Sequence, residues 1–418
     1  MVALDFVAAA EPRTLRVVKH PISHIFQHTP ETLEAWCVER GWPKFRARQV
    51  LEWVYAKGVI DPSRMTNLAK REREQLAAEM TFLSGDVLAH QLATDGTQKL
   101  LVQWSEATMR QGTVDAAGSG ALGATRDSTH AADPLAGTLA TSLPVLNAGG
   151  TSIDYGAGDP TRQTECVMIP VDDRKTACIS SQVGCPVGCR FCASGLGGLD
   201  GNLSGGRIVE QAYRLSLLPE VGRVSNVVFM GMGEPLANFR AVVQAVRTLA
   251  APWGMGISAR KITVSTVGLP QAIRKLAAEL ELPVTLALSL HAPNDELRRK
   301  LIPWSEYTTV AELLDACDEW FRKTGREITL EYILLGGVND QAEHAAELAE
   351  VAKRLRANVN LIRYNEVAGL PWRRPRTEDV RAFQGVLRDR RINAHIRASR
   401  GRDIAAACGQ LRHEAAQA

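Results

Sequence analysis

The chain has 418 residues with 45% hydrophobic content, which is enough for a large core and suits two domains. Its formal net charge is only +3, so any affinity for nucleic acid must come from local basic patches. The first residues, MVALDFVAAAEPRT, lack the basic start and long apolar stretch of a secretion signal, and no run approaches membrane-spanning length. Eight cysteines scattered among enzyme-like segments are typical of a reducing cytoplasm, so we expect a cytoplasmic protein that does not use a membrane.

The N-terminal part divides into a loosely ordered lead-in (1–30) and a small helical domain (31–90). In the run FRARQVLEWVYAKG (45–58), apolar residues recur at helical spacing, while Arg46 and Arg48 fall on other faces. This basic face is a candidate contact for RNA phosphates. A charged helix face that is simply solvated has the same pattern, so both interpretations stay open.

Two strands are predicted at 98–104 and 165–170, and the segment 106–160 separates them. This segment is rich in Gly, Ala, Thr, Ser and Asp, and Tyr155 is its only aromatic residue. Such a composition buries too little apolar surface to order itself. We therefore expect a flexible, low-complexity insertion and assign it no chemistry.

The core domain is expected to span 165–411, because strand-like apolar runs alternate there with helical patterns. The runs lie at 176–180, 226–231, 261–266, 284–291, 328–335 and 358–365. Continuous apolar strands separated by helices predict an α/β fold with a parallel sheet covered by helices. Six such units favour a partial (β/α)6 barrel over a closed eight-stranded one, and a further run at 392–399 is expected to extend or flank the sheet.

Three cysteines in the run CPVGCRFCASG are the most specific chemical feature of the chain. Cys185, Cys189 and Cys192 leave a four-iron cluster one ligand short. Catalytic metal sites keep such a position open, whereas structural sites usually complete their ligand set. No further Cys or His lies between Cys192 and Arg207 to complete a zinc site. An open 4Fe–4S cluster is therefore favoured over a zinc knuckle or a chance grouping.

Glycine-rich and polar residues collect at the carboxyl ends of the predicted strands, where parallel α/β enzymes build their sites. The run GMGEP (231–235) follows the second core strand; Gly233 allows close approach of a ligand and Glu234 offers a carboxylate acceptor. Other strand ends carry Ser265, Ser289, His291 and Asn365. His291 has an alternative interpretation as a structural histidine at a strand end.

The cysteine spacing resembles the signature of the radical S-adenosylmethionine (SAM) superfamily, in which SAM chelates the fourth iron. Further motifs narrow the resemblance: TECVMIP (164–170), CISSQVGC (178–185), GMGEPLAN (231–238), SLHAPND (289–295) and AACGQL (406–411). Together they are similar to the RlmN/Cfr family of radical SAM RNA adenine methyltransferases. The resemblance implies one 4Fe–4S cluster and SAM as cofactors. It also implies SAM contacts from Gly233, Glu234, Ser265, Ser289, Leu290, His291 and Asn365.

The same resemblance implies roles for three residues outside the cluster loop: Cys408 as an S-methylcysteine carrier, Cys178 as its partner in a transient disulfide, and Glu165 as the proton acceptor. Plainer interpretations exist for each of them. Buried cysteine is a common small hydrophobic residue, and Glu165 fits an ordinary carboxylate at a strand start. The remaining cysteines, Cys37, Cys166 and Cys317, match no catalytic position and are expected to be structural.

By resemblance, the activity is methylation of adenosine C2 in 23S rRNA (adenosine 2503, in the peptidyl transferase centre) and in tRNA (adenosine 37, next to the anticodon). Two SAM molecules are used in turn, a reduced flavodoxin-type protein donates electrons, and a monomer is expected. The runs at 45–58 and 65–70 resemble the C2 branch most closely. Two alternatives stay open: methylation of C8 of the same rRNA adenosine, as in Cfr, and a non-catalytic RNA-binding protein with a structural metal site.

An arginine-rich segment precedes Cys408 and is a candidate for binding RNA. Ten arginines lie between residues 373 and 402, and Trp372 stands beside them. Arginine binds phosphates and, like tryptophan, stacks on exposed bases. A solvated basic surface would have the same composition.

Overall fold

The computed structural model describes residues 19–104, 162–355 and 357–411. The predicted insertion at 106–160 and the first 18 residues of the lead-in lie outside the described residues.

The N-terminal domain is built from three helices, α1 (Pro30–Glu39), α2 (Phe45–Leu51) and α3 (Lys70–Glu79). A capping box at Thr29 and a proline at the first helical position begin α1. Helix α2 continues directly into a π-helical turn (Glu52–Ala56), so the helix predicted in 45–58 is present. Ile25 and Phe26 are fully buried in the core, which places the end of the predicted lead-in within the folded part.

Ten strands form one sheet in the order β1-β2-β3-β4-β7-β8-β9-β10-β11-β12. Their bounds are β1 (Gly85–Leu92), β2 (Gln98–Trp104), β3 (Gln163–Val171), β4 (Arg174–Cys178), β7 (Asn226–Phe229), β8 (Ile262–Thr266), β9 (Thr285–Ser289), β10 (Ile328–Leu334), β11 (Asn358–Arg363) and β12 (Ala394–Arg397). The strands from β4 to β12 are parallel, whereas β1 to β4 pair antiparallel. Six parallel strands confirm the predicted partial barrel, β12 extends it, and within the described residues no pairing of the edge strands closes the sheet.

Strand β1 corrects the sequence-based prediction, which extended the helical domain to residue 90. The strand lies at the edge of the sheet, and most of its side chains are exposed on both faces. An edge strand of this kind lacks the alternation of apolar and polar residues that identifies a half-buried strand. Its pairing with β2 depends on backbone hydrogen bonds, which the sequence pattern does not reveal.

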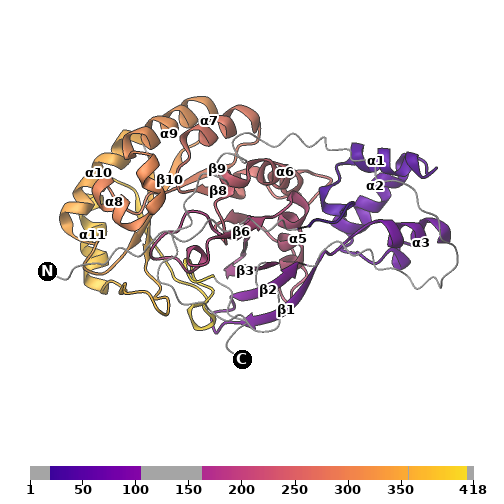
Figure 1. Ribbon diagram of the computed structural model, residues 1–418, viewed down its shortest axis with the longest axis horizontal. Coiled ribbons are helices and arrows are strands. Elements are labelled where there is room, and N and C mark those ends of the chain that lie inside the picture. Colours follow the sequence, from indigo (N-terminus) through magenta and orange to yellow (C-terminus); the bar gives the residue numbers. More distant parts are fainter. Residues whose placement is uncertain (1–18, 105–161, 356, 412–418) are drawn as a thin grey trace, which may run out of the picture.

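Helices cover the parallel part of the sheet (Figure 1). They are α5 (Gly205–Ser216), α6 (Phe239–Ala250), α7 (Pro270–Glu279), α8 (Asp295–Leu301), α9 (Val310–Thr324), α10 (Ala342–Leu355) and α11 (Thr377–Asp389). Apolar strand residues such as Ile262, Leu286 and Leu330 are fully buried and form the core. The N-terminal helices form a separate lobe beside α5 and α6, opposite to α10 and α11 (Figure 1).

A buried polar network fixes the N-terminal lobe to the barrel. Glu210 of α5 accepts hydrogen bonds from His24 Nε2 (2.9 Å), from the backbone N–H and hydroxyl of Ser84 and from Arg214 Nε (2.8 Å). Burial alone would raise the pKa of Glu210, but the hydrogen bond from His24, the charge of Arg214 and the hydrogen bond from the Ser84 backbone outweigh it and hold the pKa at about 2. The carboxylate is therefore the ionised centre of the junction.

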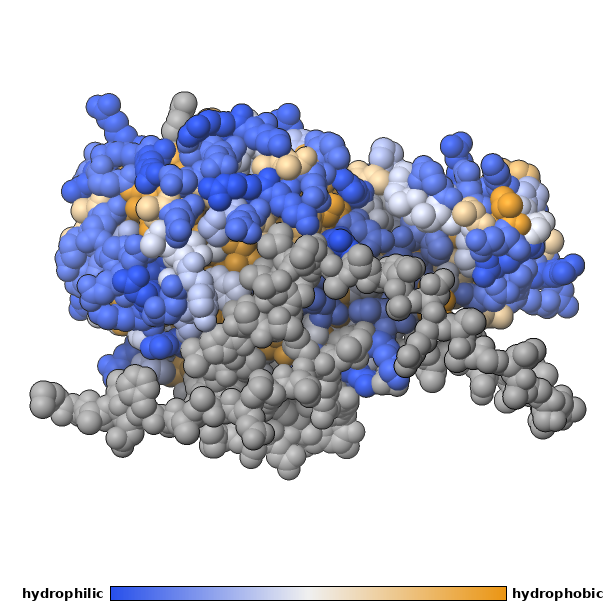
Figure 2. All heavy atoms as spheres, turned by 45° about the horizontal axis from the view of Figure 1, so that its top comes forward, coloured by the Kyte–Doolittle hydropathy of each residue, from blue (hydrophilic) through white to orange (hydrophobic). Residues whose placement is uncertain are grey.

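Across the part of the chain that the structure describes, none of the helices combines the length and apolar character needed to span a membrane. The face in Figure 2 is mostly hydrophilic over the described helices.

Candidate active site at the carboxyl ends of the strands

The three-cysteine loop is pinned at its base by a small hairpin of β5 (Gln182–Gly184) and β6 (Leu199–Asn202). Gly184 has φ of 74°, and an added Cβ would lie 2.0 Å from the carbonyl oxygen of Gly198, so only glycine fits there. The backbone N–H of Cys185 donates to the same carbonyl (2.9 Å). The local backbone therefore fixes where the cysteine loop begins and ends.

The loop presents its three thiols to one cavity at the carboxyl ends of the strands. Burial raises the pKa of Cys185 to about 12 and also raises those of Cys189 and Cys192. A bound cationic metal centre reverses this effect, because it stabilises thiolates. Within the described residues, no three Cys, His, Asp or Glu side chains converge on a single metal-ion position. Ligands of a four-iron cluster bind different iron atoms, so convergence is not required of them.

The cavity has a volume of about 130 Å³ and contains most of the predicted site residues. Its lining includes Cys185, Cys189, Cys192, Gly233, Glu234, Ser265, Ser289, His291 and Cys408. Leu290 is fully buried behind this surface. Asn365 and Cys178 lie next to Cys408, and Glu165 lies on β3 two residues from Val167, the partner of Cys178 in the sheet.

Gly233 and Glu234 form the wall next to the cysteine loop. Gly233 has φ of 103°, and an added Cβ would lie 2.7 Å from Cβ of Gln182, so this close backbone approach also requires glycine. Glu234 accepts hydrogen bonds from the backbone N–H groups of Leu236 (2.9 Å) and Val267 (2.7 Å). Burial raises its pKa to about 7, while these hydrogen bonds oppose the rise. A fixed carboxylate at this position suits an ammonium group of a ligand.

His291 makes a structural hydrogen bond and also lines the cavity. Its Nδ1 accepts a hydrogen bond from the backbone N–H of Ile333 (3.1 Å), which supports β10 and leaves Nε2 as the donor nitrogen. Burial lowers its pKa to about 3, so the ring is neutral. His291 lies just after β9, has a φ of 59° and lines the cavity. Ser265 donates to the carbonyl of Phe229 (2.5 Å) and also lines the cavity.

The C-terminal segment carries Cys408 onto the cysteine loop. Ala193 N–H donates to the carbonyl of Gly409 (2.8 Å), and Asn365 Nδ2 donates to the carbonyl of Cys408 (3.3 Å). Asn365 Oδ1 in turn accepts from Arg374 (2.9 Å). Asn365 therefore holds the backbone of the Cys408 segment from the end of β11.

Cys178 and Cys408 share one electrostatic environment. Burial and then the neighbouring Cys408 raise the pKa of Cys178 to about 12, and the positive charge of Arg397 opposes this. Burial also raises the pKa of Cys408, and Arg397 is again the opposing charge. Cys178 packs with Val167, Ala406 and other apolar residues around the same segment. The fold thus brings together two cysteines that lie 230 positions apart in the sequence.

Glu165 lies on β3, on the same face as Val167, and is 3% exposed. Its carboxylate is 2.7 Å from Nζ of Lys99, which is itself 4% exposed. Its backbone carbonyl accepts a hydrogen bond from the Ser180 hydroxyl (2.6 Å). Glu165 is therefore a buried, ion-paired carboxylate close to the Cys178–Cys408 region.

The structure also brings into the site charged residues that the sequence reading did not assign. Glu331 of β10 lines the cavity; its Oε1 accepts from Asn360 (3.1 Å), and its buried Oε2 has no hydrogen-bond partner among the described residues. Lys99, which is paired with Glu165, is the second such residue, whereas Arg397 belongs to the arginine-rich segment already identified from the sequence. A lysine in QKLLVQW and a glutamate in ITLEYILL are charges inside apolar strands, an anomaly that marks buried functional groups.

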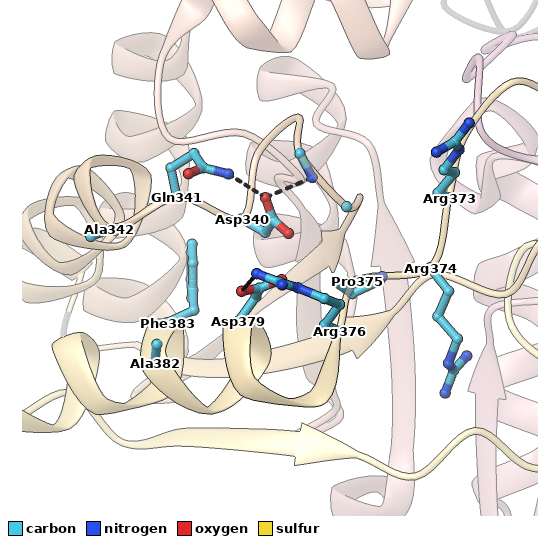
Figure 3. A pocket seen from close by; sticks show the side chains of 12 residues that line it. Asp340, Gln341, Ala342, Arg373, Arg374, Pro375, Arg376, Asp379, Ala382 and Phe383 are labelled. Carbon is cyan, nitrogen blue, oxygen red and sulfur yellow. Dashed lines mark hydrogen bonds and ion pairs between the residues drawn. The ribbon is translucent and has the colours of Figure 1, made fainter.

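The arginine-rich segment lies beside the cysteine loop and borders a second pocket of about 430 Å³ (Figure 3). Trp372 Nε1–H donates to the carbonyl of Arg190 (2.6 Å), which joins this segment to the loop. Arg376 forms a two-pronged ion pair with Asp379, whereas Arg373 extends away from both aspartates of the pocket (Figure 3).

The three cysteines without an expected catalytic role, Cys37, Cys166 and Cys317, are fully buried in the core, in line with a structural role.

Comparison with known proteins agrees with this geometry. Residues 179–349 match the model of the radical SAM superfamily, and residues 24–82 match the ribosomal RNA large subunit methyltransferase N-terminal domain. A probable dual-specificity RNA methyltransferase RlmN of Rhodopirellula baltica is 37% identical, covering 99% of this chain and 96% of the relative. The dual-specificity RNA methyltransferase RlmN of Dichelobacter nodosus is 36% identical, covering 93% of each chain.

Among solved structures, a radical SAM methyltransferase from Sphaerobacter thermophilus superposes with a TM-score of 0.77 at 36% identity, covering 93% of this chain and 99% of that chain. The fold and the three-cysteine cavity define a radical SAM enzyme, which uses a 4Fe–4S cluster and SAM. More narrowly, the chain belongs to the RlmN family of RNA methyltransferases. The three half-buried thiols fit the cluster, and the close approach at Gly233 together with the fixed carboxylate of Glu234 fits a bound SAM.

Proposed function

We propose that this enzyme methylates C2 of adenosine in 23S rRNA and in tRNA, at adenosines 2503 and 37, with Cys408 as the methyl carrier. The observation that carries the proposal is the placement of Cys408, which lines the cavity of the three cluster cysteines and interacts electrostatically with Cys178. A methyl carrier must face the cofactor during loading and a second thiol during release. Family membership supports the reaction class, an RNA methyl transfer.

Adenine C2 is an electron-poor carbon, which explains why a carrier is needed. It is a poor nucleophile and does not attack a sulfonium methyl group directly. When bound, the cluster and SAM would supply a methyl group for displacement and a hydrogen-abstracting carbon radical, and would take back the electron released on adduct formation. The residues of the chain then have to receive the methyl group, place it and release it.

Cys408 receives the methyl group as its thiolate, which Arg397 stabilises by its positive charge. After loss of one hydrogen atom, the carbon on the Cys408 sulfur bonds to C2 and links enzyme and RNA. Glu165 takes the proton from C2. Cys178 then attacks the Cys408 sulfur: a sulfur–sulfur bond forms, the sulfur–carbon bond breaks, and its electron pair stays on the carbon, which gains a proton to become the methyl group.

The overall reaction balances in atoms and charge. Two SAM cations, one adenosine and two electrons give S-adenosylhomocysteine, methionine, 5′-deoxyadenosine and the methylated adenosine. The two electrons consumed overall reduce the Cys178–Cys408 disulfide, and in this proposal a reduced flavodoxin-type protein donates them. The target base must be unstacked to reach the cavity, and the arginine-rich segment next to the cysteine loop suits the flanking phosphates.

The test is the identity of the methylated nucleoside. Anaerobically reconstituted enzyme is incubated with SAM, reductant and either 23S rRNA or tRNA, and the digested nucleosides are analysed by mass spectrometry and NMR. We expect 2-methyladenosine from both substrates. Finding only 8-methyladenosine would favour the Cfr-like reaction, and a zinc-containing protein that forms no 5′-deoxyadenosine would favour a structural metal site.

A further inference from the structure

The hairpin of β1 and β2 is hydrogen-bonded to the segment that leads to Cys408. Thr94 N–H donates to Asp403 (2.9 Å), and Gly401 N–H donates to Asp95 (3.0 Å). Gly401 packs so closely that an added Cβ would lie 2.8 Å from a methyl carbon of Thr97. This hairpin lies outside both matched family models, which cover residues 24–82 and 179–349.

Lys99 of β2 is the residue of this hairpin that contacts both Glu165 and the segment leading to Cys408. Its ammonium group lies 2.7 Å from Oε1 of Glu165 and donates to the carbonyl of Ala405 (3.4 Å), three residues before Cys408. In the register of β2 with β3, Lys99 faces Val167, and Glu165 lies two residues along on the same face. A single ammonium group thus bridges the carboxylate and the carrier segment.

The burial of this pair makes the contact a fixed one. Lys99 and Glu165 are both almost fully buried, and a charge is tolerated in such a place when it is paired. An ammonium group has three N–H donors, so it can hold a carboxylate and a carbonyl oxygen at the same time. Ala405 has φ of 49°, an uncommon conformation for alanine, at the point where the ammonium group holds its carbonyl.

We propose that Lys99 is a positioning residue for removal of the C2 proton, because it fixes the Glu165 carboxylate relative to the Cys408 segment. This inference rests on the proposed function. In the step concerned, the proton moves from C2 to Glu165 and the electron pair of the carbon–hydrogen bond stays in the ring. Lys99 transfers no proton; its contacts with Glu165 and with the carbonyl of Ala405 set the position of the carboxylate relative to the Cys408 segment.

The test compares Lys99→Met with Asp403→Ala in the full-length, cluster-loaded enzyme. The Asp403 change loosens the same segment from the same hairpin but leaves the Lys99–Glu165 pair intact. Three quantities are measured in single-turnover reactions with RNA: 5′-deoxyadenosine, covalent protein–RNA adduct and 2-methyladenosine. Iron content and thermal unfolding are measured in parallel.

With Lys99→Met, we expect 5′-deoxyadenosine to stay within about threefold of wild type while 2-methyladenosine formation falls about 10²-fold, as for a misplaced catalytic group. The covalent protein–RNA adduct should accumulate, because it forms before the proton is removed from C2 and is released only afterwards. With Asp403→Ala, every step should slow together without accumulation of adduct. If Met is not accommodated, Lys99→Gln, which keeps an N–H donor for Ala405 but lacks the charge, provides the same test.

Two results would overturn the role of Lys99. One is wild-type product formation in both Lys99 variants, and the other is adduct accumulation in Asp403→Ala equal to that in Lys99→Met. Failure of the proposed function looks different, because the wild-type enzyme itself would then form no 2-methyladenosine.

Discussion

The hydroxyl of Ser194, two residues after the last cysteine of the cluster loop, donates a hydrogen bond of 2.6 Å to the carbonyl of Leu411, three residues after Cys408. Together with the bond from Ala193 to Gly409, it makes the cysteine loop and the carrier segment one unit. The position of Cys408 therefore depends on the cysteine loop as well as on its own segment. Four predictions test this arrangement and its surroundings.

Replacing any one of Cys185, Cys189 and Cys192 with alanine should abolish the cluster, because three protein thiolates already leave one iron without a protein ligand and two would hold the cluster too weakly. We expect loss of iron and of visible absorbance, and 5′-deoxyadenosine below detection. The matched control is Cys317→Ala, a fully buried cysteine of α9, which should keep its iron and cost about 1 kcal/mol of stability, as typical core changes do. Full iron content in a cluster-loop variant would contradict the ligand assignment.

Replacing Cys178 with alanine should trap RNA on the enzyme, because the thiol that attacks the Cys408 sulfur is then missing. We expect a covalent protein–RNA species on denaturing gels and no multiple turnover. Cys166→Ala is the control, since Cys166 is a fully buried cysteine of the neighbouring strand β3 that packs into the main core, apart from the cluster of Cys178. Release of fully methylated RNA by the Cys178 variant would exclude its role.

Arg373→Ala should weaken RNA binding, because its guanidinium extends away from the aspartates of the pocket in Figure 3 and is exposed. We expect a several-fold higher Kd for RNA and a decrease of about 1 in the slope of log K against log salt, as for one lost phosphate contact. Arg376→Ala should have a smaller effect, since Arg376 is paired with Asp379. Equal salt slopes in wild type and Arg373→Ala would argue against a phosphate contact.

Acid should loosen the junction between the N-terminal lobe and the barrel through Glu210. Its pKa in the folded protein is about 2, below the ordinary value of 4.5, so its contribution is present above pH 4.5 and is lost as the pH falls toward 2. Glu210→Gln should cost about 3–5 kcal/mol, as for a broken buried ion pair, and should flatten the stability profile in that pH window. Urea unfolding between pH 2.5 and 7 measures both effects.

The control for this experiment is Glu319→Gln, which removes an exposed ion pair with Arg274 and should leave the urea midpoint nearly unchanged. If the two variants had the same pH profile, the network at Glu210 would not be the acid-sensitive element.

The sequence by itself determined the parallel strands, the cysteine loop and the glycine-rich wall. Each of these depends on residues close together in the chain: a continuous apolar run predicts a buried strand, and three cysteines within eight residues define a ligand set. Even the residues at the strand ends could be grouped, since all parallel strands place their carboxyl ends on one edge of the sheet.

Only the tertiary structure decided which groups act on one another across the site. Strand β1 lies at an exposed edge, so its sequence has no alternation of apolar and polar residues. For this reason neither the hairpin nor its hydrogen bonds to the Cys408 segment could be predicted. Lys99 and Ala405 are 306 residues apart, and their contact follows from strand register and the path of the C-terminal segment. Register and long-range packing depend on the whole fold, and no local pattern encodes them.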